Sequence, residues 1–109
     1  MGELSEKHCV ACEGGVPSLR SEEIEGLRPK IDPGWSVEND HHLEREFKFK
    51  DFNGALGFTN RVGEIAEAEG HHPNIELAWG RVKVTLWTHK AMGLTENDFI
   101  LAAKIDELA

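Results

Sequence analysis

Hydrophobic and polar residues alternate along two segments of the chain, and this pattern predicts two strands. Residues 43–50 place every second side chain on one face, namely Leu43, Arg45, Phe47 and Phe49. Residues 82–89 alternate in the same way, with Val82, Val84 and Leu86 on one face and Lys83, Thr85, Trp87 and His89 on the other. A period of two is typical of strands that lie with one face on a core. The segment 74–79 is expected to form a hairpin with the second strand, and a further short strand is expected near 35–37.

Three more segments repeat their hydrophobic residues at helical spacing. The longest follows Asp51, a favourable N-cap residue, and its core-facing positions are Ala55, Phe58, Val62, Ile65 and Ala66. A short helix starting at Ser21 is expected to end before Pro29, because the residue that precedes proline disfavours the α region. The last helix begins at Thr95, with Asp98 three residues later in a capping-box arrangement.

The order of these elements is helix, strand, strand, helix, strand, strand, helix. It predicts an α+β fold, a two-layer sandwich in which a four-stranded antiparallel sheet carries three helices on one face. Residues 1–20 lack periodicity and are expected to be an extended N-terminal lead-in, which leaves residues 21–109 as a single domain. The uncovered sheet face and the strand edges are the expected surfaces for self-association.

Composition and charge exclude several classes of function. The chain has 109 residues and a formal net charge of −8, so its surface repels the phosphates of nucleic acids and anionic membranes. No apolar run approaches the ~20 residues that span a bilayer, and the N-terminus has no apolar secretory segment, so a cytoplasmic protein is expected. Cys9 and Cys12 are the only cysteines, and without a second pair we interpret them as reduced thiols rather than half of a zinc site.

The segment EAEGHHPNIEL, which begins at Glu67, carries the clearest candidate chemistry. Glu67 and His71 are four residues apart and can share one face at a helix end, while Pro73 restricts the backbone after His72. A hairpin can return His89 to the same end of the molecule. Three imidazoles and a carboxylate can therefore converge, and imidazoles both donate and accept protons near neutral pH.

Surface exposure and metal binding also account for histidines in this pattern. Gly-His-His-Pro can be a solvated turn, with His89 at an exposed strand end. The histidines can also form a three-histidine metal site, but adjacent histidines have diverging side chains and the His-x-x-x-His spacing is absent. We therefore favour acid–base chemistry over metal binding.

These residues resemble the signature of the pterin-4a-carbinolamine dehydratase family. The signature consists of an acidic residue, three positions, His-His-Pro, an aromatic residue, a Thr-His pair and a later Asp. The matching residues in this chain are Glu67, His71, His72, Pro73, Trp79, Thr88, His89 and Asp98. FKFKDFNGALGFTNRV and GLTENDFILAAKID are also similar to family sequences, so the likeness covers roughly residues 32–108.

The resemblance implies a small α+β protein that assembles into homodimers or homotetramers. Family members dehydrate the 4a-hydroxytetrahydropterin (pterin-4a-carbinolamine) released by aromatic amino acid hydroxylases, and a reductase recycles the quinonoid dihydropterin that forms. They use no metal and no organic cofactor. The reaction needs one proton delivered to the departing hydroxyl and one removed from the neighbouring ring nitrogen, which two imidazoles beside a flat heterocycle can provide.

The resemblance also implies roles for individual residues. His71 and His89 match the proton-transfer pair. His72 matches the residue that binds or orients the hydroxyl, and Glu67 matches the residue that positions the histidines. The implied substrate-binding positions are Pro73, Thr88, Lys90, Ala91, Asp98 and Trp35. Gly70 stands where some members carry Asp, a departure that bears on substrate preference.

Two alternative functions accompany this prediction. One is a non-catalytic interaction or accessory module of the same fold, because some relatives stabilise dimers of a transcription factor. The second is a metal-dependent hydrolase with histidine ligands. The intact set of Glu67, His71, His72 and His89 favours the dehydratase.

Overall fold

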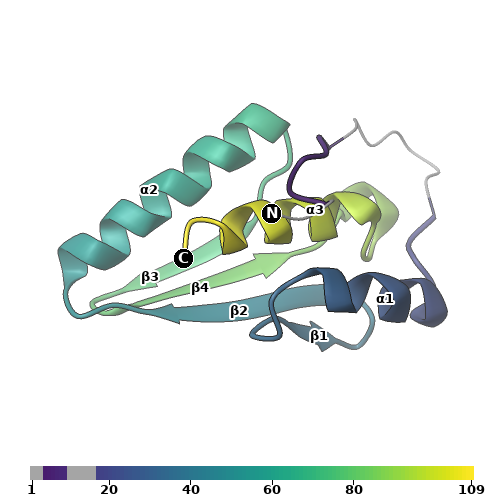
Figure 1. The fold of residues 1–109 in the computed structure, drawn as a ribbon, viewed down its shortest axis with the longest axis horizontal. Helices are drawn as coiled ribbons and strands as arrows, with labels where there is room; N and C mark the ends of the chain where they lie inside the picture. Colours follow the sequence, from purple (N-terminus) through teal and green to yellow (C-terminus); the bar gives the residue numbers. More distant parts are fainter. Residues whose placement is uncertain (1–3, 10–16) are drawn as a thin grey trace.

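The computed structural model describes residues 4–9 and 17–109, whose elements are drawn in Figure 1. In chain order they are α1 (Ser21–Leu27), the 3-10 turn η1 (Arg28–Lys30), β1 (Ser36–Glu38), β2 (His42–Lys48), α2 (Phe52–Glu69), β3 (Asn74–Ala78), β4 (Arg81–Leu86), the 3-10 turn η2 (His89–Ala91) and α3 (Glu96–Asp106). The strands form one antiparallel sheet in the order β1-β2-β4-β3. The helices lie on one side of it, which confirms the predicted α+β sandwich.

The predicted alternation in β2 and β4 holds, and it places the core between the sheet and the helices. Leu43 and Phe47 of β2 are buried, and so are Val82, Val84 and Leu86 of β4. On the helix side α2 contributes its predicted stripe, in which Ala55, Phe58, Val62 and Ala66 are buried and Ile65 packs at the margin. The side chains that the two periods selected therefore form the part of the core that lies between β2, β4 and α2.

Helix α3 is buried around most of its circumference. Its buried residues are Asn97, Asp98, Phe99, Ile100, Leu101, Ala102, Ala103 and Ile105. Neighbouring segments must therefore cover this helix on most of its sides. Figure 1 shows α3 in the centre of the molecule, between the sheet and the N-terminal segment.

Part of the predicted lead-in packs against the domain. Leu4 is 2% exposed and joins the core. Ser5 accepts a hydrogen bond at its carbonyl from Lys104 Nζ at 2.8 Å, and the Cys9 amide donates to Glu69 Oε1 at 2.7 Å. Residues 4–9 thus contact α2 and α3. Cys12, the second predicted thiol, lies outside the described residues.

The face of the sheet away from the helices is charged. Its side chains form cross-strand ion pairs, with Lys83 Nζ 3.5 Å from Glu44 and Arg81 3.2 Å from Glu46. Among the described residues no helix has both the length and the apolar character needed to cross a membrane. Self-association through this face or through the strand edges stays a prediction.

Candidate active site

The turn that follows α2 places the two adjacent histidines. Gly70 ends the helix with φ of 67°, a left-handed conformation that glycine adopts at low cost. The His71 amide then donates back to Ala66 O at 3.2 Å, which fixes the exit of the chain from the helix. The chain changes direction here, so helical spacing no longer decides which side chains meet beyond residue 69.

The two imidazoles contact different carboxylates. His71 Nε2 lies 2.6 Å from Asp98 Oδ1, and His72 Nε2 lies 2.9 Å from Glu67 Oε1. Helical spacing predicts that Glu67 shares a face with His71. The left-handed turn at Gly70 instead places the Glu67 carboxylate beside the imidazole of His72. The first pair is buried, whereas the second is solvated, with 61% of the His72 side chain and 82% of the Glu67 side chain exposed.

Asp98 is the buried group that organises this site. It is fully buried, and its Oδ2 accepts hydrogen bonds from the Thr95 amide and from Thr88 Oγ1, each at 2.9 Å. Its Oδ1 faces His71. Asp98 therefore serves both as the predicted cap of α3 and as the partner of a histidine, and it ties together the turn after α2, the segment after β4 and the start of α3.

The pairing with Asp98 has a chemical consequence for His71. An ionised carboxylate only accepts hydrogen bonds, so it selects the tautomer of His71 that carries its proton on Nε2. The Nδ1 atom then keeps a lone pair that can take up a proton. A carboxylate that orients an imidazole in this way is a recurring arrangement in acid–base catalysis.

Three histidines line a single pocket of about 390 Å³ in this chain. The lining residues are Gly70, His71, His72, Trp87, Thr88, His89 and Lys90. His71 and His72 come from the turn after α2, and His89 comes from η2 rather than from a strand end, because the chain leaves the sheet where Thr88 pairs with Gly93. The structure thus brings together the three imidazoles that the sequence singled out.

The remaining predicted substrate-binding residues, apart from Trp35, lie at or beyond the margin of this pocket. Thr88 and Lys90 line it. Pro73 follows His72 and Ala91 follows Lys90, and both are half-buried without lining the pocket. Asp98 lies behind His71.

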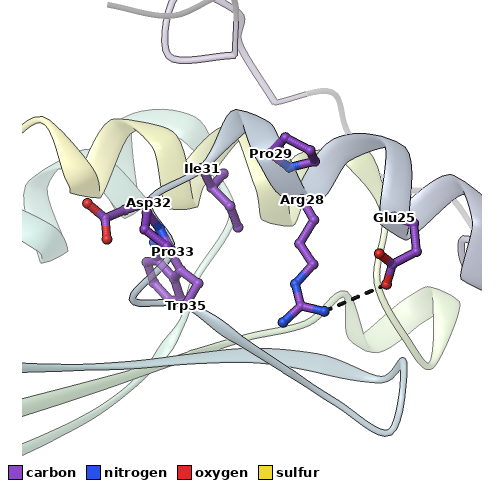
Figure 2. Close-up of a pocket in the computed structure, with 7 residues that line it drawn as sticks. All are labelled: Glu25, Arg28, Pro29, Ile31, Asp32, Pro33 and Trp35. Carbon is purple, nitrogen blue, oxygen red and sulfur yellow. Dashed lines mark ion pairs between the residues drawn. The ribbon is translucent and has the colours of Figure 1, made fainter.

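Trp35 lines a different pocket from the one that holds the histidines. Its pocket, of about 520 Å³, is formed by Glu25, Arg28, Pro29, Ile31, Asp32, Pro33 and Trp35 (Figure 2). The indole is 2% exposed and donates from Nε1 to Asp106 Oδ1 at 2.7 Å, at the far end of α3 from Asp98. Within this single chain Trp35 is therefore a buried packing residue and does not line the histidine pocket.

The pocket also contains a residue that sequence reasoning did not assign to it. Trp87 lines the pocket, and its ring centroid lies 4.5 Å from that of His89. The available signal was its position between Leu86 of the predicted strand and the Thr88-His89 pair. A tryptophan on the solvent side of a strand is also explained by packing alone, so that signal did not suffice.

The described residues offer no ready metal centre. No group of three or more His, Cys, Asp or Glu side chains within them has the geometry to hold an ion. The reason is visible at the turn, where His71 and His72 point to separate carboxylates.

Cys9 lies behind the start of α3, where its Sγ is 3.6 Å from the Asn97 carbonyl oxygen. Burial, together with the negative charges of Glu69 and Asp98, raises the pKa of Cys9 to about 12. Cys9 is therefore a protonated, unreactive thiol at neutral pH.

Comparisons with known proteins agree with this picture. The family model for pterin 4 alpha carbinolamine dehydratase matches residues 17–108. A protein of Rubrobacter xylanophilus with the provisional name pterin-4-alpha-carbinolamine dehydratase is 56% identical over 99% of this chain and 100% of its own length. One of Alkaliphilus metalliredigens with the same provisional name is 54% identical, covering 98% of this chain and 96% of its own.

Two solved structures share the fold. A crystal structure described as a transcriptional coactivator/pterin dehydratase from Brucella melitensis has a TM-score of 0.78 and 38% identity, covering 84% of this chain and 98% of that one. A pterin dehydratase-like protein identified as a RuBisCO assembly factor in the alpha-carboxysome has a TM-score of 0.60 and 26% identity, covering 70% and 89%. Because the family model spans nearly the whole described domain and the relatives match end to end, this chain belongs to the pterin-4a-carbinolamine dehydratase family.

Proposed function

We propose that this protein dehydrates a 4a-hydroxytetrahydropterin to the quinonoid dihydropterin and water by histidine acid–base catalysis. The observation that carries the proposal is the convergence of His71, His72 and His89 on one pocket, with His71 anchored to the buried Asp98. Membership of the family supplies the substrate class.

The reaction breaks one bond and moves two protons. The bond from C4a to the hydroxyl oxygen breaks, and the hydroxyl leaves as water after it gains a proton. The adjacent ring nitrogen loses its proton, and a double bond forms between that nitrogen and C4a. No net proton is consumed, so one imidazole that donates and one that accepts are sufficient.

The geometry suggests how these tasks are divided. His71 and His89 come from two different segments that border the pocket, which suits a pair acting on two sites of a flat ring. His71, oriented by Asp98, is the group with a preset tautomer. His72 orients the departing hydroxyl, and its partner Glu67 holds that imidazole in place. Thr88 and Lys90 border the substrate.

The test is the decay of the 4a-carbinolamine signal generated by an aromatic amino acid hydroxylase, with and without the protein. General acid–base groups contribute ~10²- to 10⁴-fold, so His71→Ala and His89→Ala are each expected to lower kcat at least ~100-fold. His8→Ala is the matched control, because that side chain is 82% exposed and does not line the pocket. Unchanged rates in both pocket variants would show that the acid–base assignment is wrong.

The biological setting follows from the same proposal. The protein would act in the cytoplasm as a homodimer or homotetramer, in recycling the tetrahydropterin used by an aromatic amino acid hydroxylase. Co-purification with such a hydroxylase and the mass of the assembly by light scattering test these two points separately.

An accessory role is the second candidate, and the structural neighbours favour it. One is described as a RuBisCO assembly factor and another as a transcriptional coactivator/pterin dehydratase. In this role the protein would bind a macromolecular partner through its fold rather than its histidines. The His71→Ala and His89→Ala variants would then retain a partner recovered by pull-down, whereas the dehydratase role predicts that they lose their function in tetrahydropterin recycling.

A further inference from the structure

Trp87 connects the histidine pocket to the solvent-facing side of the sheet. It follows β4 directly, is half-buried and lines the pocket. Its ring and that of His89 are 4.5 Å apart between centroids, with an angle of 76° between their planes. This edge-to-face arrangement is the favoured geometry for two aromatic rings in contact.

His89 differs from the remaining two pocket histidines in how it is held. His71 has Asp98 and His72 has Glu67 as a carboxylate partner. Within residues 4–9 and 17–109, the ring of His89 packs against the ring of Trp87. His89 is exposed, and it lies on a 3-10 turn of only three residues. The contact with Trp87 therefore limits the orientations open to the imidazole of His89.

A second pair of histidines, His41 and His42 at the start of β2, also packs near the ring of Trp87. The ring centroids of His41 and His42 lie 5.5 Å and 6.1 Å from that of Trp87. The pairing of Leu43 with Leu86 explains the contact, because continuing the antiparallel register by one residue brings His42 opposite Trp87.

The β1–β2 turn fixes this second pair. Asn39 and Asp40 have φ of 56° and 54°, which is the hairpin-turn conformation that Asn and Asp tolerate well. The turn presents His41 next to His42, with their Nδ1 atoms 3.0 Å apart. His42 Nε2 in turn lies 3.0 Å from Glu44 Oε2. The β1–β2 hairpin thus holds His41 and His42 in place beside the indole of Trp87.

We propose that Trp87 is a positioning residue for His89, and that the histidine pair 41–42 holds Trp87 in place. This inference rests on the proposed dehydratase function, since it assigns His89 a proton-transfer role. Trp87 orients the third imidazole by ring packing, as Asp98 and Glu67 orient the first two by hydrogen bonding. The β1–β2 hairpin, which carries none of the family's signature residues, becomes part of the site.

The kinetic test separates positioning from direct stacking on the substrate. An edge-to-face contact is worth roughly one tenfold step in rate, so Trp87→Ala is expected to lower kcat about 3- to 10-fold with KM unchanged. Trp87→Phe, which keeps an aromatic ring, should restore most of kcat. A rise in KM with unchanged kcat would mean that Trp87 binds the substrate directly, and the positioning role would be wrong.

A double-mutant cycle tests whether Trp87 acts through His89. In a His89→Ala background Trp87→Ala should cost nothing further, because the group that it positions is gone. Additive losses would overturn the proposal. Trp79→Ala is the matched tryptophan control, since Trp79 is 68% exposed at the opposite end of β4 and does not line the pocket.

A measurement without catalysis keeps the inference separate from the proposed function. In the NMR spectrum the chemical shifts of the His89 ring protons should differ from random-coil values because of the ring current of Trp87. Trp87→Ala should remove that difference, and His41→Ala should reduce it, while Trp79→Ala leaves it unchanged. Random-coil chemical shifts for the His89 ring protons in the unaltered protein would overturn the inference, even if the protein is an active dehydratase. A displaced signal in an inactive protein would instead refute the proposed function and keep the ring contact.

Discussion

The two ends of helix α3 each carry a carboxylate that joins distant segments of the chain, Asp98 fully buried and Asp106 partly buried. At the start of the helix, Asp98 binds Thr95, Thr88 and His71. At the end, Asp106 Oδ1 accepts hydrogen bonds from Arg45 at 2.6 Å and from Trp35 Nε1 at 2.7 Å. Both residues close the fold around α3, but only Asp98 lies next to the histidine pocket.

The difference between the two ends is the side chain that faces each carboxylate. Arg45 keeps its charge throughout the accessible pH range, and the remaining donors to Asp106 are an indole N–H and the Asp32 amide. The donors to Asp106 therefore keep their protons. His71 can gain and lose a proton, and its ring lines a pocket. A carboxylate in the interior thus stabilises the fold beside a permanent cation, whereas it can serve chemistry beside an imidazole that faces a cavity.

The largest expected effect comes from Asp98→Asn. The amide oxygen can still accept from the Thr95 amide, but the amide nitrogen then faces His71 and stabilises the opposite tautomer, with the proton on Nδ1. We expect kcat to fall more than ~100-fold, as for catalytic histidines that lose the carboxylate fixing their tautomer. Circular dichroism and thermal unfolding check that the variant is folded, and near-normal kcat would contradict the contrast between the two ends.

A smaller effect, on stability rather than activity, is expected from Asp106→Ala. The variant leaves Arg45 and the Trp35 indole with one partner fewer, and Asp32 at 3.5 Å from Arg45 replaces only part of the loss. The free energy of unfolding should fall by about 2–3 kcal/mol, because a partly buried cation and an N–H group lose their acceptor. Urea denaturation measures this, with Glu46→Ala as an exposed control. The contrast between the two ends would be wrong if kcat of the folded Asp106→Ala variant fell as far as that of Asp98→Asn.

The smallest effect is the pH dependence that Asp106 adds to stability. Burial raises the pKa of Asp106 above its ordinary value of 3.8, and this outweighs the lowering by hydrogen bonds from Asp32 and Trp35 and by the charge of Arg45. In the pH range just above 3.8 the folded state therefore binds more protons at this position than the unfolded state. The contribution of Asp106 to the free energy of unfolding is present below that range and decreases as the pH rises through it.

A difference between two proteins tests the direction of this effect. The free energy of unfolding of the wild type minus that of Asp106→Asn should decrease with rising pH just above 3.8 and be flat at neutral pH. A difference that increased with pH there would mean that the hydrogen bonds and Arg45 dominate over burial.

Local patterns sufficed for most of the fold. Alternation over residues 43–50 and 82–89 identified β2 and β4 together with the faces that they bury, and helical spacing identified the stripe of α2. These predictions succeed because side-chain direction depends on a residue's own backbone conformation. The packing of Leu4 was not predictable in the same way, because a single apolar residue in a polar segment has no period.

The candidate site was only partly accessible from the sequence. The three pocket histidines stand out through their motif, but the partner of each imidazole does not. Spacing suggested Glu67 for His71, and the left-handed turn at Gly70 reversed that assignment. Trp35 matched a family position, yet in this chain it packs at the Asp106 end of α3.

By itself, the sequence determined the α+β order of elements, the core faces of the strands and helices, and the family to which the chain belongs. The elements and their core faces depend on residues close together along the chain. Only the tertiary structure decided that Asp98 orients His71, and that Trp87 lies between His89 and the β1–β2 hairpin. The contacts of Asp98 with His71 and of Trp87 with His41 join residues 27 and 46 positions apart, as the differences 98 − 71 and 87 − 41 give. Their formation depends on how the sheet and helices pack, which no local pattern encodes.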